Sequence, residues 1–294
     1  MADAAPHPAL PDAVTWLFVP AVRPDRYAKA IAAGPDAVVV DLEDSVPAGA
    51  KADARRALAQ AWPHAVAPVL AAGPRPAVVV RVNARTTAEF AADAALCREL
   101  RPSAVVLPKA ESGEDVRAAA QACGVPVLPL VESARGLVDL REVAACADTA
   151  RLLFGGVDLA LDLGAADDVA LDSARADLVR YSAAFRLPPP VDGVTTAVRD
   201  PDAAARDAAR ARGWGFGGKL CVHPSQVAVV AAAFAPEPAE VERARAVLAA
   251  ADRADAAGEG AVALDGEMID RPVVERARRL LERAARAARA EPAG

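Results

Sequence analysis

The chain of 294 residues lacks several features that mark particular classes of protein. Its four cysteines are scattered and include no Cys-x-x-Cys pair, so we expect reduced thiols in a cytoplasmic protein and no disulfide framework. No apolar run approaches the ~20 residues that a membrane-spanning helix needs. Residues 1–12 contain no basic segment followed by an apolar one, which indicates a disordered tail rather than a signal peptide. The net charge of −6 argues against nucleic-acid binding.

Histidine and lysine are also scarce. Only one of the three histidines, His223, follows an expected strand, so we do not expect a histidine-based triad or zinc site. Nearly all the basic residues of the chain are arginine. Arginine cannot serve as a compact or deprotonable amine, so each lysine in such a chain is a better functional candidate than a lysine in a chain with balanced usage. The glycine-rich segment 213–218 precedes an expected strand instead of joining a strand to a helix, so it does not read as a dinucleotide-binding loop. The only lysines are Lys29, Lys51, Lys109 and Lys219.

What the chain does contain is an alternation of short apolar runs and helical stretches, repeated eight times. The runs are rich in Val or Leu and lack polar alternation, which is typical of strands buried on both faces of a parallel sheet. Eight β/α units over about 220 residues predict a (β/α)8 TIM barrel, with a doubly wound open sheet as the alternative. The expected strands are Trp16–Pro20, Ala37–Leu42, Ala77–Val82, Ala104–Leu107, Val125–Val131, Arg151–Val157, Val191–Thr195 and Lys219–Val222.

The expected barrel spans residues 13–235 and leaves a C-terminal segment, 236–294. This segment has helix-like sequence, a glycine-containing break at 258–260 and a terminal amphipathic helix. A barrel does not need such an appendage. We therefore expect a C-terminal helical extension that packs on a neighbouring subunit or covers a site as a lid.

Five of the expected strands end on a charged or polar group. Polar groups at the C-terminal ends of parallel strands form the active sites of α/β enzymes, so these residues outline a candidate active-site rim. They are Asp41, Glu43 and Asp44 at the end of the second strand, Arg81 at the end of the third, Lys109 after the fourth, Glu132 after the fifth and Asp158 after the sixth.

Glu132 and Asp158 are the first candidates for metal ligands. They end neighbouring expected strands, which would bring their carboxylates close together. Two carboxylates with room for waters suit Mg²⁺, which takes oxygen ligands in an octahedral shell. A metal held there could act as a Lewis acid on a 2-oxo or 2-hydroxy acid. The structural alternative is that each carboxylate caps a helix or pairs with an arginine.

The other rim residues allow more than one interpretation. Arg81 could grip a substrate carboxylate or stabilise an enolate, or it could form a structural ion pair with Glu43 or Asp44. Asp41, Glu43 and Asp44 could hold the waters of a metal ion, or they could stabilise the loop and cap the next helix. Lys109 could form a Schiff base with a carbonyl substrate, although we favour an ion pair with a rim carboxylate.

Several short motifs occur in order along the chain: Leu17-Phe18-Val19-Pro20, Arg23-Pro24-Asp25-Arg26, Asp41-Leu42-Glu43-Asp44-Ser45-Val46 with Lys51, Val80-Arg81-Val82-Asn83, Leu107-Pro108-Lys109, Val131-Glu132-Ser133-Ala134-Arg135-Gly136, Phe154-Gly155-Gly156-Val157-Asp158, Gly217-Gly218-Lys219, His223-Pro224-Ser225-Gln226 and Gly266-Glu267-Met268-Ile269-Asp270. Together these motifs resemble the HpcH/HpaI aldolase/citrate lyase family, which includes the citrate lyase β-subunit. The chain departs from the family pattern at three places: Val14-Thr15 in place of Arg-Ser, Ala21 in place of Gly, and Ser133 in place of Thr.

The resemblance implies a TIM barrel that forms homotrimers or hexamers and uses Mg²⁺. It implies cleavage or formation of a 3-hydroxyacyl-CoA thioester of the citryl-CoA, malyl-CoA or citramalyl-CoA type, with acetyl-CoA or a similar thioester and a 2-oxo acid as the products. Asp270 resembles the family's catalytic acid/base, carried on the C-terminal lid of a neighbouring subunit. The implied metal ligands are Glu132 and Asp158, supported by Glu43, Asp44 and Lys109, and the implied substrate-binding residues are Phe18, Arg23, Lys29, Arg81, Glu132 and His223.

Two further functions stay open at this stage. One is a metal-dependent aldolase that acts on a free hydroxy-oxo acid and needs no CoA contacts. The other is a β-subunit that works only within a citrate lyase-type complex. The sequence does not distinguish citryl, malyl and citramalyl groups.

Overall fold

The computed structural model describes residues 8–73, 76–257, 262–264 and 266–290. The chain divides into two compact units, residues 1–234 and 235–294. Within the part of the chain that the structure describes, no helix combines the length and apolar character that crossing a membrane takes. The four cysteines are free thiols.

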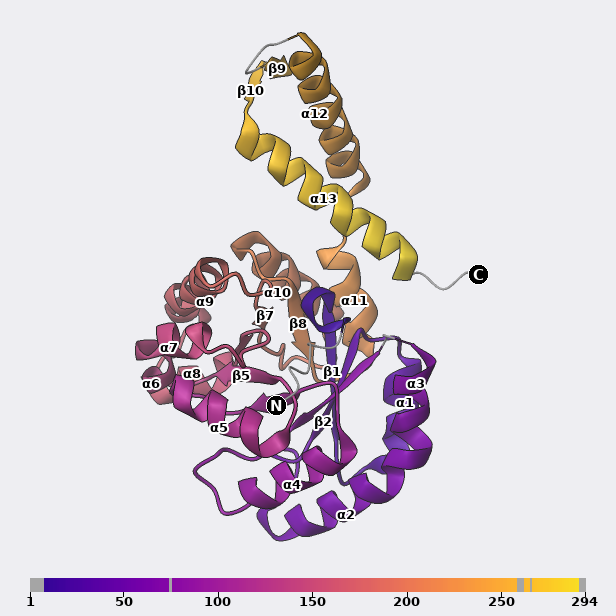
Figure 1. Cartoon of the computed structure of the whole chain (residues 1–294), viewed down its shortest axis with the longest axis vertical. Coiled ribbons are helices and arrows are strands. Elements are labelled where there is room, and N and C mark those ends of the chain that lie inside the picture. The colour runs from indigo at the N-terminus through magenta and orange to yellow at the C-terminus, as the bar shows by residue number, and fades with distance from the viewer. Residues whose placement is uncertain (1–7, 74–75, 258–261, 265, 291–294) are drawn as a thin grey trace. The chain divides into compact units, whose positions relative to one another are not determined.

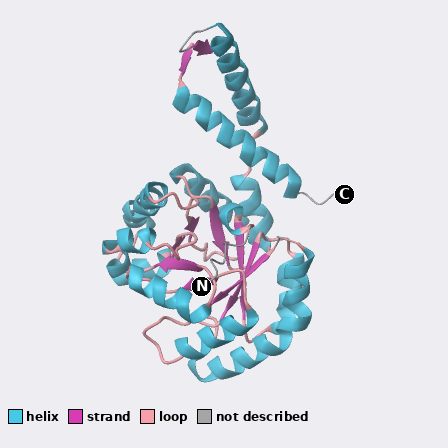
Figure 2. Ribbon diagram, viewed as in Figure 1, coloured by secondary structure: helices cyan, strands magenta, loops and turns pink. Residues whose placement is uncertain are grey.

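The first unit is a closed barrel of eight parallel strands, in the order β1 to β8, surrounded by helices (Figures 1 and 2). β1 pairs with β8 as well as with β2, which closes the sheet and excludes the open-sheet alternative. The strands are β1 (Thr15–Pro20), β2 (Ala37–Asp41), β3 (Ala77–Arg81), β4 (Val105–Leu107), β5 (Val127–Val131), β6 (Leu153–Phe154), β7 (Val191–Asp192) and β8 (Gly218–Cys221).

The helices of the first unit follow the strands in turn. They are α1 (Tyr27–Ala32), α2 (Lys51–Ala61), α3 (Ala67–Ala72), α4 (Phe90–Leu100), α5 (Gly113–Cys123), α6 (Ala134–Val138), α7 (Leu140–Ala145), α8 (Gly156–Leu163), α9 (Asp172–Ala184), α10 (Pro201–Trp214) and α11 (Ser225–Phe234). Shorter helical turns are η1 (Leu10–Asp12), η2 (Pro24–Arg26), η3 (Ala48–Ala50), η4 (Trp62–Val66) and η5 (Asp168–Leu171).

Side-chain alternation along the strands separates two apolar layers. One layer fills the barrel interior, and the other lies between the strands and the helices. Because the side-chain period of a strand is two, the interior residues also fix which polar residues at the strand ends face inward. The interior layer includes Trp16, Val39, Val79, Val106, Leu128, Leu130, Leu153, Val191 and Leu220.

Residues 8–12, which the sequence assigned to a disordered tail, are partly ordered. η1 contains Leu10, which is buried against the barrel interior. Arg151 lies just before β6 and donates hydrogen bonds to the carbonyl oxygens of Leu10 and Ala13, at 2.9 and 2.7 Å. Complete burial lowers the pKa of Arg151 to about 9. These contacts hold the segment at the barrel wall, and residues 1–7 lie outside the described part of the chain.

The sixth strand is much shorter than the expected range of Arg151–Val157. β6 ends at Phe154, and α8 begins at Gly156. A Cβ atom on Gly155 would lie 2.4 Å from Glu132 Cβ, so the chain passes against the end of β5 where only glycine fits. The apolar run therefore continues from a strand into a helix, and Asp158 lies in the first turn of α8 rather than at a strand end.

The second unit consists of two long helices and a small hairpin. Its helices are α12 (Pro238–Ala257) and α13 (Arg271–Ala290), and its antiparallel strands are β9 (Val262–Leu264) and β10 (Glu267–Ile269). An apolar cluster that includes Val247, Ile269 and Ala277 joins the helices to the hairpin. Gly266 has a φ of +82°, which a glycine adopts readily in the hairpin turn. The sequence predicted helices here but not the hairpin.

Candidate active site at the barrel rim

Four inward-facing side chains, three of them charged, gather at the C-terminal end of the barrel. Each lies two residues beyond a side chain of the barrel interior and therefore shares its direction. They come from β1, β2, β3 and β5, and the charged ones are all buried. In order, they are Phe18 after Trp16, Asp41 after Val39, Arg81 after Val79 and Glu132 after Leu130.

Arg81 forms the centre of this group. Its Nε and Nη2 atoms donate to the two carboxylate oxygens of Asp41, at 2.7 and 2.8 Å. Its Nη1 atom lies 2.9 Å from Glu43 Oε2 and 3.4 Å from Asp44 Oδ2. The guanidinium carbon lies 4.8 Å from the centre of the Phe18 ring. The structural ion pair is thus present, and its bidentate partner is Asp41, which the sequence did not single out for Arg81.

Asp41 is a carboxylate that the protein fully compensates. Burial tends to raise its pKa, but the ion pair with Arg81 and the hydrogen bonds from the following loop outweigh burial and hold the pKa below its ordinary value. Those hydrogen bonds come from the backbone N–H groups of Glu43 and Ser45, at 2.9 and 3.0 Å. Asp41 therefore positions both Arg81 and the loop that carries Glu43.

Two further side chains hold the same loop from outside. Lys51 Nζ donates to the carbonyl oxygens of Leu42 and Glu43, at 2.8 Å each. Asn83 Nδ2 donates to the Leu42 oxygen at 3.0 Å, and Asp93 in turn accepts from Asn83. The motif residues Lys51 and Asn83 thus hold the loop through its backbone carbonyl groups. This role depends on contacts that exist only in the folded chain, so a local sequence pattern does not reveal it.

Glu132 lies at the end of β5 with 4% of its surface exposed. Its Oε1 atom accepts the backbone N–H of Lys109 at 2.9 Å. Lys109 has a φ of +50°, and its side chain is exposed. Lys109 therefore contacts Glu132 through its backbone, and its amine lacks the burial that would favour a Schiff-base lysine.

The surroundings of Glu132 disfavour its ionised form. Burial, together with the charges of Glu43 and Asp158, raises the pKa of Glu132 to about 8. Burial also raises the pKa of Glu43 to about 7, with Asp44 and Asp41 adding to the effect against the opposing charge of Arg81. Glu43 Oε2 is buried without an aligned hydrogen bond, although Arg81 lies close to it. A bound cation would relieve this excess of charge.

The donor set fits a hard divalent cation that keeps much of its water. Within the described ranges, no three His, Cys, Asp or Glu side chains are grouped closely enough to enclose a metal ion. A cage built by the protein alone is therefore absent there. Two carboxylates with waters in the other positions is the arrangement that Mg²⁺ commonly takes, and Glu132 and Asp158 offer such a pair.

Three of the residues that the resemblance implies for substrate binding, Arg23, Lys29 and His223, lie around β1 and β8, which are hydrogen-bonded neighbours. Arg23 is exposed and forms a bidentate ion pair with Asp25, at 2.9 and 2.7 Å. Lys29 is exposed on α1. His223 is exposed after β8, and its Nδ1 atom lies 2.8 Å from Ser225 Oγ at the start of α11. These segments leave the barrel at one sector of its rim.

Asp270 lies in the second unit, between β10 and α13. Its Oδ1 atom accepts the backbone N–H of Val273 at 3.1 Å, and its backbone oxygen accepts the N–H of Val274. The side chain is partly exposed. In this unit, Asp270 therefore caps the beginning of α13.

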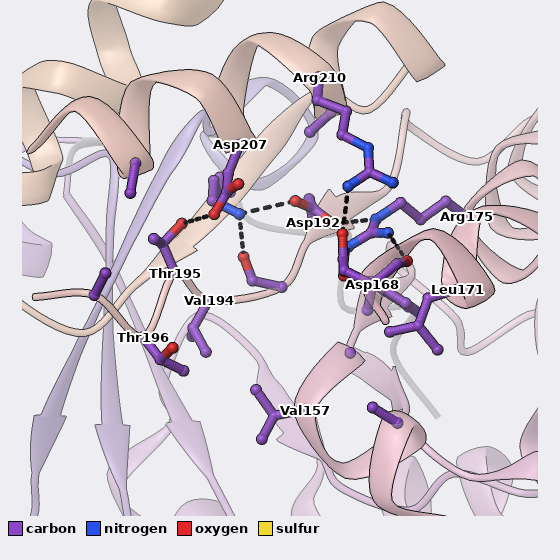
Figure 3. A pocket seen from close by; sticks show the side chains of 18 of the residues that line it. Val157, Asp168, Leu171, Arg175, Asp192, Val194, Thr195, Thr196, Asp207 and Arg210 are labelled. Carbon is purple, nitrogen blue, oxygen red and sulfur yellow. Dashed lines mark hydrogen bonds and ion pairs between the residues drawn. The ribbon is translucent and has the colours of Figure 1, made fainter. Parts of the chain in front are cut away.

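A separate cavity of about 480 Å³ is lined by residues of β6, β7, β8 and the helices that follow β6 and β7, and none of the predicted site residues lines it (Figure 3). Lys219 donates to Asp192 Oδ2 at 2.8 Å and to the Gly193 oxygen at 2.7 Å. Arg175 contacts Asp192, Asp168 and Asp172. Asp192 and Lys219 alternate with the interior residues Val191 and Leu220, so they point away from the barrel axis. We call this group the outer network: Asp168, Asp172, Arg175, Asp192, Arg210 and Lys219.

Comparison with known proteins gives consistent relatives. A model of the HpcH/HpaI aldolase/citrate lyase family matches residues 15–224. A citrate lyase subunit beta-like protein of Deinococcus radiodurans is 39% identical over 275 residues, covering 90% of this chain and 95% of the relative. A (3S)-malyl-CoA thioesterase of Cereibacter sphaeroides is 32% identical, covering 91% and 93%. The human mitochondrial citramalyl-CoA lyase is 29% identical, covering 89% and 82%.

Among solved structures, protein CitE from Mycobacterium tuberculosis is similar throughout. Its crystal structure in complex with magnesium, acetoacetate and coenzyme A matches with a TM-score of 0.80 and 36% sequence identity. The match covers 94% of this chain and all of the other.

Proposed function

Because the chain belongs to the HpcH/HpaI aldolase/citrate lyase family, we propose that it is a Mg²⁺-dependent carbon–carbon lyase. The proposed substrate is a 3-hydroxyacyl-CoA thioester of the citryl-CoA, malyl-CoA or citramalyl-CoA type. The proposed products are acetyl-CoA or a similar thioester and a 2-oxo acid. The observation that carries the proposal is the placement of the buried Glu132 carboxyl group beside the carboxylates of Glu43 and Asp158, with Arg81 as an opposing charge that acts on Glu132.

Glu132 and Asp158 would hold the metal, with Glu43 and Asp44 placed to accept hydrogen bonds from its waters. Mg²⁺ bound there would supply Lewis-acid stabilisation to the oxygen that becomes the keto oxygen of the product. Arg81 would bind the carboxylate of the oxo acid through Nη1, which Asp44 contacts at 3.4 Å from an exposed position. While the substrate carboxylate replaces Asp44 at Nη1, Asp41 would keep the other side of the guanidinium fixed.

Cleavage transfers the proton of the 3-hydroxyl group to solvent, breaks the bond between C2 and C3, and leaves a thioester enolate that must take up a proton at C2. We assign that protonation to Asp270, carried by the second unit of a neighbouring subunit in a trimer or hexamer. Phe18, Arg23, Lys29 and His223 would bind the CoA thioester at the β1–β8 sector.

The test is a panel of citryl-CoA, malyl-CoA and citramalyl-CoA, each assayed with Mg²⁺ and with EDTA. Both products are measured, because hydrolysis by a thioesterase releases free CoA and a hydroxy acid instead. The proposal predicts Mg²⁺-dependent release of a 2-oxo acid with an acyl-CoA from at least one member by the isolated protein. Turnover only of a free hydroxy-oxo acid, only of the thioester bond, or only after addition of complex partners would each overturn it.

A further inference from the structure

The two proposed metal ligands come from different elements, so their spacing needs a structural cause. Glu132 directly follows β5, whereas Asp158 lies in the first turn of α8. β6, which leads into α8, has only two residues. A metal site that is misplaced by about 1 Å loses much of its affinity, because its ligands must keep a fixed geometry. Contacts that orient α8 relative to β5 are therefore relevant to the site.

One such contact joins the two ligand-bearing segments directly. Asp162 Oδ2 accepts the backbone N–H of Ala134 at 2.7 Å. Ala134 is the first residue of α6 and follows Glu132 by two positions. Ser133, the residue between them, accepts the N–H of Gly136 at 3.1 Å and donates to Glu111 at 2.8 Å. The first N–H groups of a helix have no partner within it, so Asp162 satisfies a group that otherwise lacks one.

Asp162 also shares a helix face with Asp158. The two residues are four positions apart on α8, which places their side chains one above the other. A contact that holds Asp162 against the segment after β5 therefore turns Asp158 toward the same segment. The start of α8 is fixed separately, because Gly155 packs directly against Glu132.

We propose that Asp162 is a positioning residue that sets the spacing between Glu132 and Asp158 through its hydrogen bond to the Ala134 N–H. The inference rests on the proposed function, since these two carboxylates are the proposed metal ligands. Asp162 acts through the orientation of α8 and does not itself contact metal or substrate. Its side chain is exposed, so its removal leaves the core of the barrel intact.

The test separates the position of the acceptor from its charge. It measures the affinity of the metal-free, full-length protein for Mn²⁺ by electron paramagnetic resonance. Asp162→Asn keeps an oxygen acceptor at the same position and removes the charge, and we expect it to weaken Mn²⁺ binding less than about tenfold. Asp162→Glu keeps the charge and displaces the acceptor, and Asp162→Ala removes both. We expect Asp162→Ala to weaken binding by about 10–100-fold, with Asp162→Glu between Asp162→Ala and Asp162→Asn.

The matched control is Asp200→Ala. Asp200 is also exposed, and its carboxylate accepts the N–H of Ala203 at 3.0 Å at the start of α10. This variant should bind Mn²⁺ as the wild type does. If Asp162→Ala fails to fold, the comparison of Asp162→Asn with Asp162→Glu still decides whether the position of the acceptor sets the affinity for Mn²⁺.

Three results would overturn the inference. Wild-type affinity in Asp162→Ala would show that the contact does not set the site, with the proposed function left standing. A larger loss in Asp162→Asn than in Asp162→Glu would show that charge, and not position, is what matters. Absence of Mn²⁺ binding by the wild type would remove the proposed metal site itself, and the inference with it.

Discussion

The two charged groups of the barrel differ in their balance. In the outer network, Lys219, Arg175 and Arg210 each contact carboxylates, and the pKa of Asp168 is lowered because its ion pairs outweigh its burial. The other group, which we call the rim cluster, has one cation that forms ion pairs within the described residues, and it comprises Asp41, Glu43, Asp44, Arg81 and Glu132. There, the pKa values of Glu43 and Glu132 are raised.

This difference distinguishes a structural role from a functional one. In a balanced network each charge is compensated by its partners, and removing one partner of a buried ion leaves that ion uncompensated. An excess of one sign in a buried position costs stability unless something else supplies the opposite charge. The rim cluster is therefore the place where an external cation improves the energetics, whereas the outer network needs none.

The largest expected effect is on activity, in the rim cluster. Glu132→Ala should lower kcat/KM in the presence of Mg²⁺ by about a thousandfold, because several kcal/mol of transition-state stabilisation depend on the metal. Its thermal stability should stay close to that of the wild type. The check is kcat/KM with and without Mg²⁺, together with a melting curve. Retained Mg²⁺-dependent turnover would contradict the assignment of Glu132.

The next effect is on stability, in the outer network. Asp192→Ala leaves the buried Lys219 without its carboxylate, and we expect it to lower the free energy of unfolding by about 3–5 kcal/mol. Urea denaturation measures this change. Asp177→Ala is the control, because Asp177 pairs with an exposed Arg180 and should cost only about 0–1 kcal/mol. Equal losses in the two variants would mean that the network contributes no more than a surface pair.

A cation should stabilise the protein through the rim cluster alone. At a Mg²⁺ concentration a hundredfold above its dissociation constant, the wild type should gain about 2.7 kcal/mol. Glu132→Gln should gain much less, because it lacks one ligand, whereas Asp192→Asn should gain as much as the wild type. A thermal shift with and without Mg²⁺ decides this, and the same gain in Glu132→Gln would place the cation elsewhere.

The last expected effect is the pH dependence of stability without metal. The folded pKa of Glu132, about 8, lies above its ordinary value of 4.5, so the folded state holds this proton more tightly than the unfolded state does. Stability should therefore fall as the pH rises from about 4.5 to about 8. Glu132→Gln should flatten this slope, as urea denaturation across the range would show. An unchanged slope would mean that Glu132 ionises normally.

Much of the barrel could be predicted because strand burial leaves a local signal. The eight apolar runs predicted the eight strands, and most ends of the predicted strands lie within two residues of the ends in the structure. Alternation along these runs also explains why Arg81 and Glu132 face inward. The outcome for Lys109 shows the limit of this reasoning, because its backbone contacts Glu132 while its side chain is exposed.

The features that could not be predicted depend on contacts between distant segments. Asp158 lies on a helix because Gly155 must pass against Glu132, and the apolar run alone does not reveal that turn. Asp41 binds Arg81 because the two are partners in the register of β2 and β3. Asp162 resembles any exposed helical aspartate until its partner, Ala134, is known. The β9–β10 hairpin follows from packing against α12 and α13 rather than from strand propensity.

The most direct test of the central claim is calorimetric titration of the metal-free protein with Mg²⁺ near pH 7 in two buffers of different ionisation enthalpy. Because Glu132, with a pKa of about 8, is mostly protonated at that pH, binding should release about one proton per ion. Glu132→Gln should abolish both the binding and the release. Binding without proton release, or binding that Glu132→Gln leaves unchanged, would contradict the claim that the rim cluster takes the metal.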